Sequence, residues 1–229
     1  MRSLSSSNFL RPFAELAVLA FFLSGQALAE GQISPLPNPV VDQPAAKNPA
    51  KQSAVFAGGC FWGVQAVFQH VKGVISATSG YAGGAKDTAK YELVSTGATG
   101  HAESVKVVYD PSKISYGQLL KVYFAAAHNP TQLNRQGPDT GTQYRSEIFV
   151  ASPEQKKIAE AYIGQLSAAR IYPKKIVTRV SSLPAFYPAE AYHQNFATLH
   201  PDNPYIAIND LPKLDHLKAQ FPELYRQAE

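Results

Sequence analysis

Short runs in which apolar and polar residues alternate predict a set of β-strands. The clearest run is Glu103–Tyr109, which alternates along its length and is stopped by Asp110-Pro111. Other short apolar runs bounded by turn residues predict strands at 53–57, 74–79, 146–150 and 176–180.

Between these runs, apolar residues recur three and four positions apart, which is the spacing of a buried helix face. A helix is predicted from the cap Ser115 to about Ala127, and its buried side carries Leu119, Leu120, Val122, Tyr123 and Phe124. Further helices are predicted to start after Cys60, to run from 153 to about 169, to end at about 199, and to lie in the tail from 212. One helical turn is predicted at 91–94. Strands and helices mix without regular alternation, which favours an α+β fold with a mainly antiparallel sheet and packed helices.

The first residues have the pattern of an export signal. Arg2 and Arg11 precede an apolar run at 16–23, and Ala27-Leu28-Ala29 has the small-x-small form that signal peptidases cut. We therefore expect a signal peptide at 1–29, cleavage after Ala29 and export, most simply to a bacterial periplasm. The apolar run is too short to span a bilayer, so stable membrane insertion is not expected.

The next segment, 30–52, is rich in Pro, Ala and Asn and has no hydrophobic period, which predicts a flexible linker. The catalytic domain is then expected at 53–229. Apolar residues are 45% and charged residues 17% of the chain, which is typical of a globular protein. The net charge of +4 comes from Lys and Arg that never cluster beyond pairs, so nucleic acid is not an expected partner. We expect a monomer.

One cysteine in the whole chain excludes an internal disulfide, a cysteine-rich zinc site and an iron–sulfur cluster. His101-Ala102-Glu103 has the His-x-Glu form of zinc deaminases, but the downstream cysteine pair that those enzymes need is missing. No metal site is therefore expected.

That cysteine, Cys60, lies in Gly58-Gly59-Cys60-Phe61-Trp62-Gly63, between a predicted strand and a predicted helix. Backbone N–H groups at a helix N-terminus favour a thiolate over a thiol, which predicts a reactive sulfur. A single cysteine is otherwise most often a small buried hydrophobe.

Several blocks of sequence together resemble the A type of peptide methionine sulfoxide reductase. They are Gly59–Gly63, Gly100–Glu103, His128–Gln132, Arg135–Asp139, Gly141–Ser146, Phe186–Glu190 and Tyr192–Gln194. The resemblance covers 53–200. It implies a two-layer α+β sandwich with long coil segments, and thiol-dependent reduction of methionine S-sulfoxide, peptide-bound and possibly free.

Reduction of a sulfoxide needs a nucleophile for sulfur and a proton for the departing oxygen. Cys60 as a thiolate supplies the attack and becomes a sulfenic acid. Glu103 begins a strand in apolar company, where burial would keep a carboxylic acid neutral near pH 7. By resemblance, Glu103 is the catalytic acid, and Tyr91 and Tyr144 donate hydrogen bonds to the sulfoxide oxygen.

The resemblance also implies a binding site for the substrate. Phe61 and Trp62 would form an apolar slot for the S-methyl group, since aromatic faces pack well against sulfur-bearing groups. Asp139 would help to hold the substrate region and its water. The alternatives are that Phe61 belongs to the core, and that Asp139 only caps the turn at Gly141.

The chain departs from the family at three points. Gln65 stands where Glu is common, and Asn129 stands where Asp precedes Pro-Thr-Gln. The further cysteines with which many members resolve the sulfenic acid are absent. We therefore expect no prosthetic cofactor, and regeneration by an external thiol such as a thioredoxin-like protein.

Two other functions fit part of the sequence. Cys60 with His101 or His193 as a base would suit a cysteine hydrolase or acyltransferase, which accumulates a thioester instead of a sulfenic acid. An exported peptide-binding module would use Cys60 only structurally, and Cys60→Ser would leave its function intact.

Overall fold

The computed structural model describes residues 36–43 and 50–227, and its centre is a six-stranded sheet. The strand order is β7-β6-β1-β3-β2-β8, in which β6 and β7 run parallel and every other pair is antiparallel. A two-stranded hairpin, β4-β5, forms a second small sheet. The predicted signal peptide at 1–29 and its cleavage site at Ala29 lie outside the described residues.

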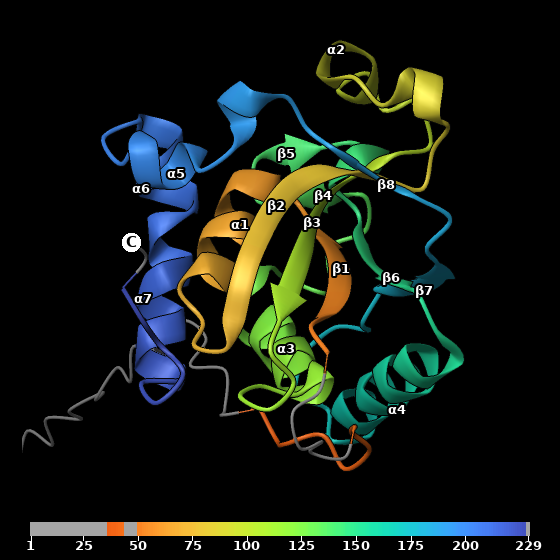
Figure 1. The fold of residues 1–229 in the computed structure, drawn as a ribbon, viewed down its shortest axis with the longest axis vertical. Coiled ribbons are helices and arrows are strands. Elements are labelled where there is room, and N and C mark those ends of the chain that lie inside the picture. Colours follow the sequence, from red (N-terminus) through yellow and green to blue (C-terminus); the bar gives the residue numbers. More distant parts are fainter. Residues whose placement is uncertain (1–35, 44–49, 228–229) are drawn as a thin grey trace, which may run out of the picture. The chain divides into compact units, whose positions relative to one another are not determined.

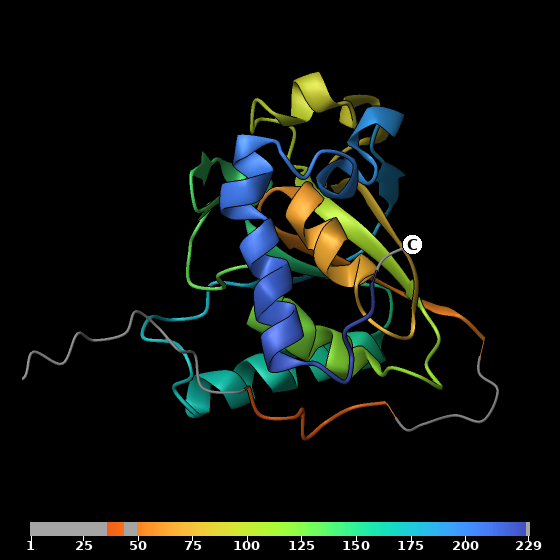
Figure 2. The ribbon, with the colours of Figure 1, turned by 90° about the vertical axis from the view of Figure 1, so that its left-hand side faces the viewer.

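The strands are β1 (Gln52–Gly58), β2 (Val74–Ala82), β3 (Ala102–Tyr109), β4 (Arg135–Gln136), β5 (Asp139–Thr140), β6 (Ser146–Val150), β7 (Arg179–Ser182) and β8 (Phe186–Pro188). The α-helices are α1 (Phe61–Gln69), α2 (Tyr91–Val94), α3 (Tyr116–Val122), α4 (Pro153–Ala168), α5 (Phe196–Leu199), α6 (Pro204–Asn209) and α7 (Leu211–Gln220). Helices α1 and α7 lie on the same side of the sheet (Figures 1 and 2). The prediction of an α+β sandwich is confirmed.

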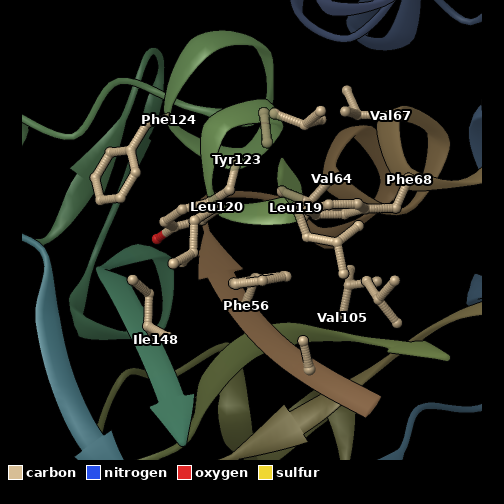
Figure 3. Packing of buried hydrophobic residues seen from close by; sticks show 14 of the residues in the cluster. Phe56, Val64, Val67, Phe68, Val105, Leu119, Leu120, Tyr123, Phe124 and Ile148 are labelled. Atoms are coloured by element: carbon tan, nitrogen blue, oxygen red, sulfur yellow. The ribbon is translucent and has the colours of Figure 1, made fainter. Parts of the chain in front are cut away.

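Alternation along β1 explains why both faces of the sheet are covered. Ala54 and Phe56 point into the main core, whereas Val55 and Ala57 belong to a smaller cluster on the other face. Phe56 packs among residues of α1 and α3 (Figure 3), and its ring stacks on that of Phe68 with centroids 5.1 Å apart.

The helix predicted from Ser115 to about Ala127 is present, but its last turn is wider than an α-helix. Ser115 and Gln118 form a reciprocal capping box at its start, with bonds of 3.1 and 2.9 Å between side chain and backbone. Tyr123–Ala127 then forms a π-helical turn. All five residues expected on the buried side are buried.

Some boundaries differ from the predictions. The strand expected at 176–180 is β7, shifted to 179–182, and the strand expected at 74–79 is β2, which continues to Ala82. The helix expected before Leu199 is a 3₁₀ turn followed by the short α5, because Asn195 takes a left-handed conformation between them. The helix expected in the tail from 212 is α7, and the short α6 just before it was not predicted.

Residues 36–43, expected to be part of a flexible linker, are packed against the domain. Leu36 is buried in the main core, and the Pro37 carbonyl accepts a hydrogen bond of 2.9 Å from the Tyr162 hydroxyl. Asp42 accepts bonds from Ser115 Oγ (2.5 Å) and from the Gly117 N–H (2.8 Å), at the positive N-terminus of α3. The folded domain therefore begins before residue 53.

Among the described residues, we find no helix with the length and apolar character required to cross a bilayer.

Replacing Asp42 should measure the contribution of this N-terminal segment. Asp42→Ala removes two hydrogen bonds at a helix N-terminus, and we expect the free energy of unfolding to fall by about 1–3 kcal/mol. Chemical denaturation of the full chain would measure the loss, with the exposed Asp87→Ala as the matched control. Equal stability of the two variants would show that the segment contributes nothing through Asp42.

Candidate functional site

The ends of several elements bring the predicted site residues together. Cys60 follows β1 as the N-cap of α1, and Glu103 is the second residue of the antiparallel neighbour β3. Phe56 pairs with Val105 in that register, so Glu103 lies at the level of Gly58, close to the point where the chain turns into α1. The other contributing elements, α2, the β4-β5 hairpin and α6, gather at the same, upper end of the molecule in Figure 1.

A cavity of about 170 Å³ lies at this end of the sheet. It is lined by Cys60, Phe61, Trp62, Tyr91, Glu103, Asp139, Tyr144 and Tyr205. All seven residues proposed from the sequence are in this set. Tyr205 was not foreseen, because nothing around it in the sequence distinguishes it from the other 11 tyrosines of the chain.

Glu103 is a buried acid that stays protonated at neutral pH. Its side chain is held by the Phe61 N–H, which donates to Oε2 over 3.0 Å, and the residue is only 2% exposed. Burial raises the pKa of the carboxyl to about 8, and the charges of Asp139 and Asp210 act in the same direction. The bond from Phe61 opposes this shift without reversing it.

The prediction that the helix N-terminus favours a Cys60 thiolate is wrong for the resting protein. The Trp62 N–H does hydrogen-bond to the sulfur and lowers its pKa, but burial raises the pKa far more, and so do the charges of Glu103 and Asp210. The residue is 8% exposed and forms part of the cavity wall, so the sulfur is not sealed inside the protein. The sulfur is therefore a thiol at rest, beside a neutral acid.

An ion pair between Asp210 and Lys213 lies against the first turn of α1. Asp210 is 1% exposed, and its Oδ1 accepts a bond of 2.9 Å from Lys213 Nζ. A Cβ added to Gly63 would be 2.0 Å from this oxygen, so the glycine is required for the approach. Burial raises the pKa of Asp210, and the Lys213 ammonium opposes this. The negative charge of Asp210 raises the pKa of the Cys60 thiol, and the positive charge of Lys213 lowers it.

The two predicted hydrogen-bond donors, Tyr91 and Tyr144, come from a helix start and a 3₁₀ turn. Burial raises the pKa of both phenols, and the charge of Glu103 adds to this, so both remain donors at neutral pH. Tyr91 is anchored by its backbone: its N–H donates to Glu190 Oε1 over 3.0 Å, and Glu190 Oε2 accepts from the Tyr81 hydroxyl over 2.8 Å.

Aromatic rings build the apolar wall of the cavity. The Trp62 indole stacks on Phe196 with centroids 3.9 Å apart, and its N–H donates to His193 Nδ1 over 3.2 Å. The His193 ring also packs against Phe61 (5.0 Å) and Tyr91 (4.4 Å). Phe61 is both core and cavity wall, which joins the two interpretations that the sequence left open.

Asp139 and Tyr205 also line the cavity and are bonded to each other. The Tyr205 hydroxyl donates to Asp139 Oδ2, and the Tyr205 ring meets Trp62 edge to face at 6.1 Å. Asp139 is therefore bonded to another residue of the cavity wall, which favours a role in the site over a turn cap.

The two histidines proposed for a hydrolase do not offer a base to Cys60. His101 Nδ1 accepts from the Gly84 N–H (3.2 Å), and its Nε2 bonds to the Ala85 carbonyl (2.9 Å). His193 Nδ1 already accepts from Trp62. Nucleophilic catalysis by a Cys–His pair needs the base within hydrogen-bond reach of sulfur, and neither histidine is bonded to Cys60.

Gln65 and Asn129, the two substituted positions among the three departures from the family pattern, are not part of the cavity wall. Gln65 is buried and bonds to the Ala77 carbonyl and to Gln194 Oε1, both at 3.0 Å. Asn129 Oδ1 accepts two bonds from Thr131 in a local turn. Within the described part of the chain, no group of three His, Cys, Asp or Glu side chains could hold a metal ion.

Comparison with known proteins identifies one family. The family model described as peptide methionine sulfoxide reductase matches residues 52–225. A relative from Mesorhizobium japonicum, named peptide methionine sulfoxide reductase MsrA 2, is 63% identical over 187 residues, which are 82% of this chain and 95% of the relative. A protein of the same name from Synechocystis sp. is 49% identical over 207 residues, or 87% of this chain and 97% of the relative.

Solved structures agree with this. The reduced form of Mxr1 from Saccharomyces cerevisiae matches with a TM-score of 0.62 at 30% identity, over 69% of this chain and 91% of that one. Methionine sulfoxide reductase A of Corynebacterium diphtheriae matches with a TM-score of 0.58 at 35% identity, over 73% and 83% of the two chains.

The acidic neighbours of Cys60 should be visible in its reactivity. Glu103→Gln and Asp210→Asn each remove a negative charge that raises the pKa of the thiol, so each should lower the pH midpoint of alkylation by iodoacetamide by about one unit. Glu92→Gln, on the exposed side of α2, is the matched control. If all four proteins, wild type included, share one midpoint, the assigned electrostatics are incorrect.

Proposed function

This chain belongs to the peptide methionine sulfoxide reductase family, and we propose that it works there as an exported enzyme whose single cysteine carries the whole catalytic cycle. It reduces the S-sulfoxide of methionine to methionine and consumes thiol reductant. The observation that carries the proposed roles is the cavity in which Cys60 adjoins a carboxylic acid that is neutral at pH 7.

In the first step, Cys60 attacks the sulfoxide sulfur and the S–O bond breaks. The oxygen ends on the cysteine as a sulfenic acid, and the substrate leaves as the thioether, so the cysteine is oxidised by two electrons and methionine sulfoxide is reduced by two. A thiol and a sulfoxide thus give a sulfenic acid and methionine, with no other reactant.

The second requirement is a proton at the sulfoxide oxygen. Glu103 supplies it, because its pKa of about 8 keeps the carboxyl protonated at neutral pH while leaving it weak enough to accept the proton back. The attacking sulfur must lose a proton as the oxygen gains one. The proton of the Cys60 thiol passes to Glu103 as the proton of Glu103 passes to the oxygen, so the two groups act as a coupled pair.

The remaining cavity residues orient the substrate. Tyr91 and Tyr144 donate hydrogen bonds to the sulfoxide oxygen as its charge grows, a role for which a neutral phenol is suited. Phe61 and Trp62 pack around the S-methyl group. Asp139, held by Tyr205, stands where it can accept a bond from the substrate's backbone or from a water.

Regeneration requires two equivalents of an external thiol. The first condenses with the sulfenic acid to give a mixed disulfide and water, and the second releases Cys60 as a thiol and leaves an external disulfide. A thioredoxin-like protein is the natural donor, because it delivers both thiols from one molecule.

A single turnover without reductant tests this cycle. Stoichiometric protein mixed with a peptide carrying the S-sulfoxide should yield one methionine per chain and then stop, with one oxygen added at Cys60 by mass spectrometry. The R-sulfoxide peptide is the matched control and should give none. Repeated turnover without thiol, or an active Cys60→Ser variant, would contradict the single-cysteine cycle.

We also propose that the chain is exported and acts as a monomer in the periplasm. The support is the charged start, the apolar run and the Ala27-Leu28-Ala29 cut site in the sequence. Protein recovered from the periplasmic fraction of an expressing bacterium should begin at Glu30, which N-terminal sequencing would detect. A control with Ala29→Asp should retain the first residues, and an intact Met1 on the native protein would contradict export by this signal.

A further inference from the structure

Arg145 is a buried cation that the proposed mechanism does not use. It follows Tyr144 directly, is 8% exposed and pairs with Glu147 through a bond of 2.5 Å from Nε to Oε2. Glu147 is 4% exposed, and its other oxygen accepts from Ser181 Oγ at 2.6 Å. Taking such a pair out of water is costly, so its presence is weak evidence for a contribution to stability.

The other guanidinium nitrogens bind backbone carbonyls of two separate segments. Nη1 donates to the carbonyls of His101 (3.1 Å) and Thr142 (2.9 Å), and Nη2 donates to that of Gly100 (2.9 Å). His101 lies two residues before Glu103, and Thr142 lies two residues before Tyr144. One nitrogen atom thus ties together the backbone that carries the proposed acid and the backbone that carries a proposed oxygen donor.

Further hydrogen bonds connect the same segment to the loop that follows Tyr91, the third residue proposed to bind the sulfoxide oxygen. The Thr142 hydroxyl donates to the Gly97 carbonyl (2.7 Å), and Gln143 Nε2 donates to that of Ser95 (2.9 Å). Residues 95–101 connect α2, which begins with Tyr91, to β3, which carries Glu103. The segment from 142 to 145 therefore holds all three oxygen-binding groups in one hydrogen-bonded frame.

The backbone at Gly83 packs closely against the Arg145 guanidinium. Gly83, the residue after β2, has a positive φ of 99°, and a Cβ there would be 2.9 Å from Arg145 Nη2 and 3.0 Å from the Gly100 carbonyl oxygen. Because a lysine has one nitrogen on a flexible stem, it cannot reproduce the planar fork that reaches Glu147 and three carbonyls at once.

We propose that Arg145 is a positioning residue that fixes the spacing between the Glu103 carboxyl and the Tyr144 hydroxyl for sulfoxide reduction. This inference rests on the proposed roles of those two residues. Without the guanidinium, the backbone at 100–101 is no longer tied to the backbone at 142. The rate of reduction then falls, because Glu103 and Tyr144 no longer reach the sulfoxide oxygen together.

The test compares Arg145→Lys with wild type and with Arg179→Lys, an exposed arginine on β7 of the same sheet. With dithiothreitol as reductant and a peptide S-sulfoxide as substrate, Arg145→Lys should lose about 100-fold in kcat with KM changed by less than about threefold. Its midpoint for iodoacetamide alkylation of Cys60 should also move to lower pH, because water that enters between the released segments hydrates the Cys60 thiolate, and burial is the main cause of the raised pKa of that thiol. Arg179→Lys should match wild type in both measurements.

The outcomes separate this inference from the proposed function. If wild type and both variants fail to reduce the sulfoxide, the proposed function is wrong, and the alkylation profile, which needs no turnover, still tests Arg145. If all three proteins show equal kcat and equal midpoints, the inference is overturned even where Arg145→Lys melts at a lower temperature.

If Arg145→Lys does not fold, Ser181→Ala provides a milder variant. It removes one bond from Glu147 and leaves the arginine in place, so we expect a smaller loss of kcat, about 3- to 10-fold, with the same downward shift of the alkylation midpoint. Unchanged kcat and midpoint in Ser181→Ala would then overturn the inference.

Discussion

The structure of this site depends on the burial of one carboxyl group beside one thiol. Glu103 is taken out of water between β2 and the start of α1, where Tyr81 is its strand partner and the Phe61 N–H is its hydrogen-bond donor. The cost of burying a charge here keeps the acid neutral, and the same environment keeps Cys60 protonated. Both reacting groups therefore rest in their uncharged forms, and charge develops only when a substrate is present to receive the proton.

This arrangement explains why a helix N-terminus alone does not give a free thiolate. The dipole and the Trp62 N–H act on the sulfur over a short range, whereas burial and two carboxyl groups oppose them. A resting thiol is less open to oxidation than a thiolate, since oxidation follows thiolate character and exposure. For an enzyme with one cysteine and none in reserve, that protection preserves the catalytic group between substrates.

The sequence was sufficient for the elements that carry the chemistry. The alternation of polar and apolar residues predicted β3, the capping residue Ser115 predicted the start of α3, and the glycines around Cys60 predicted the turn into α1. It was insufficient where a contact over a long distance decides the outcome. Tyr205 and Asp210 enter the site only because α6 and α7 pack back across α1, and no local pattern records that packing. The linker prediction was wrong at residues 36–43 for the same reason, because Asp42 binds to residues at the start of α3, 73 and 75 positions further along the chain.

The C-terminal helices also bear on how the enzyme is regenerated. Tyr205 on α6 lines the cavity beside Trp62, and Asp210 and Lys213 at the start of α7 lie against Gly63 in the first turn of α1. Cys60 is 8% exposed and lines a cavity of about 170 Å³. A thiol that attacks the sulfenic acid therefore has to enter this cavity, whether it belongs to a small molecule or to a cysteine of a larger protein. The same requirement fits the substrate, because methionine sulfoxide is a long, unbranched side chain that can reach into a cavity from the surface.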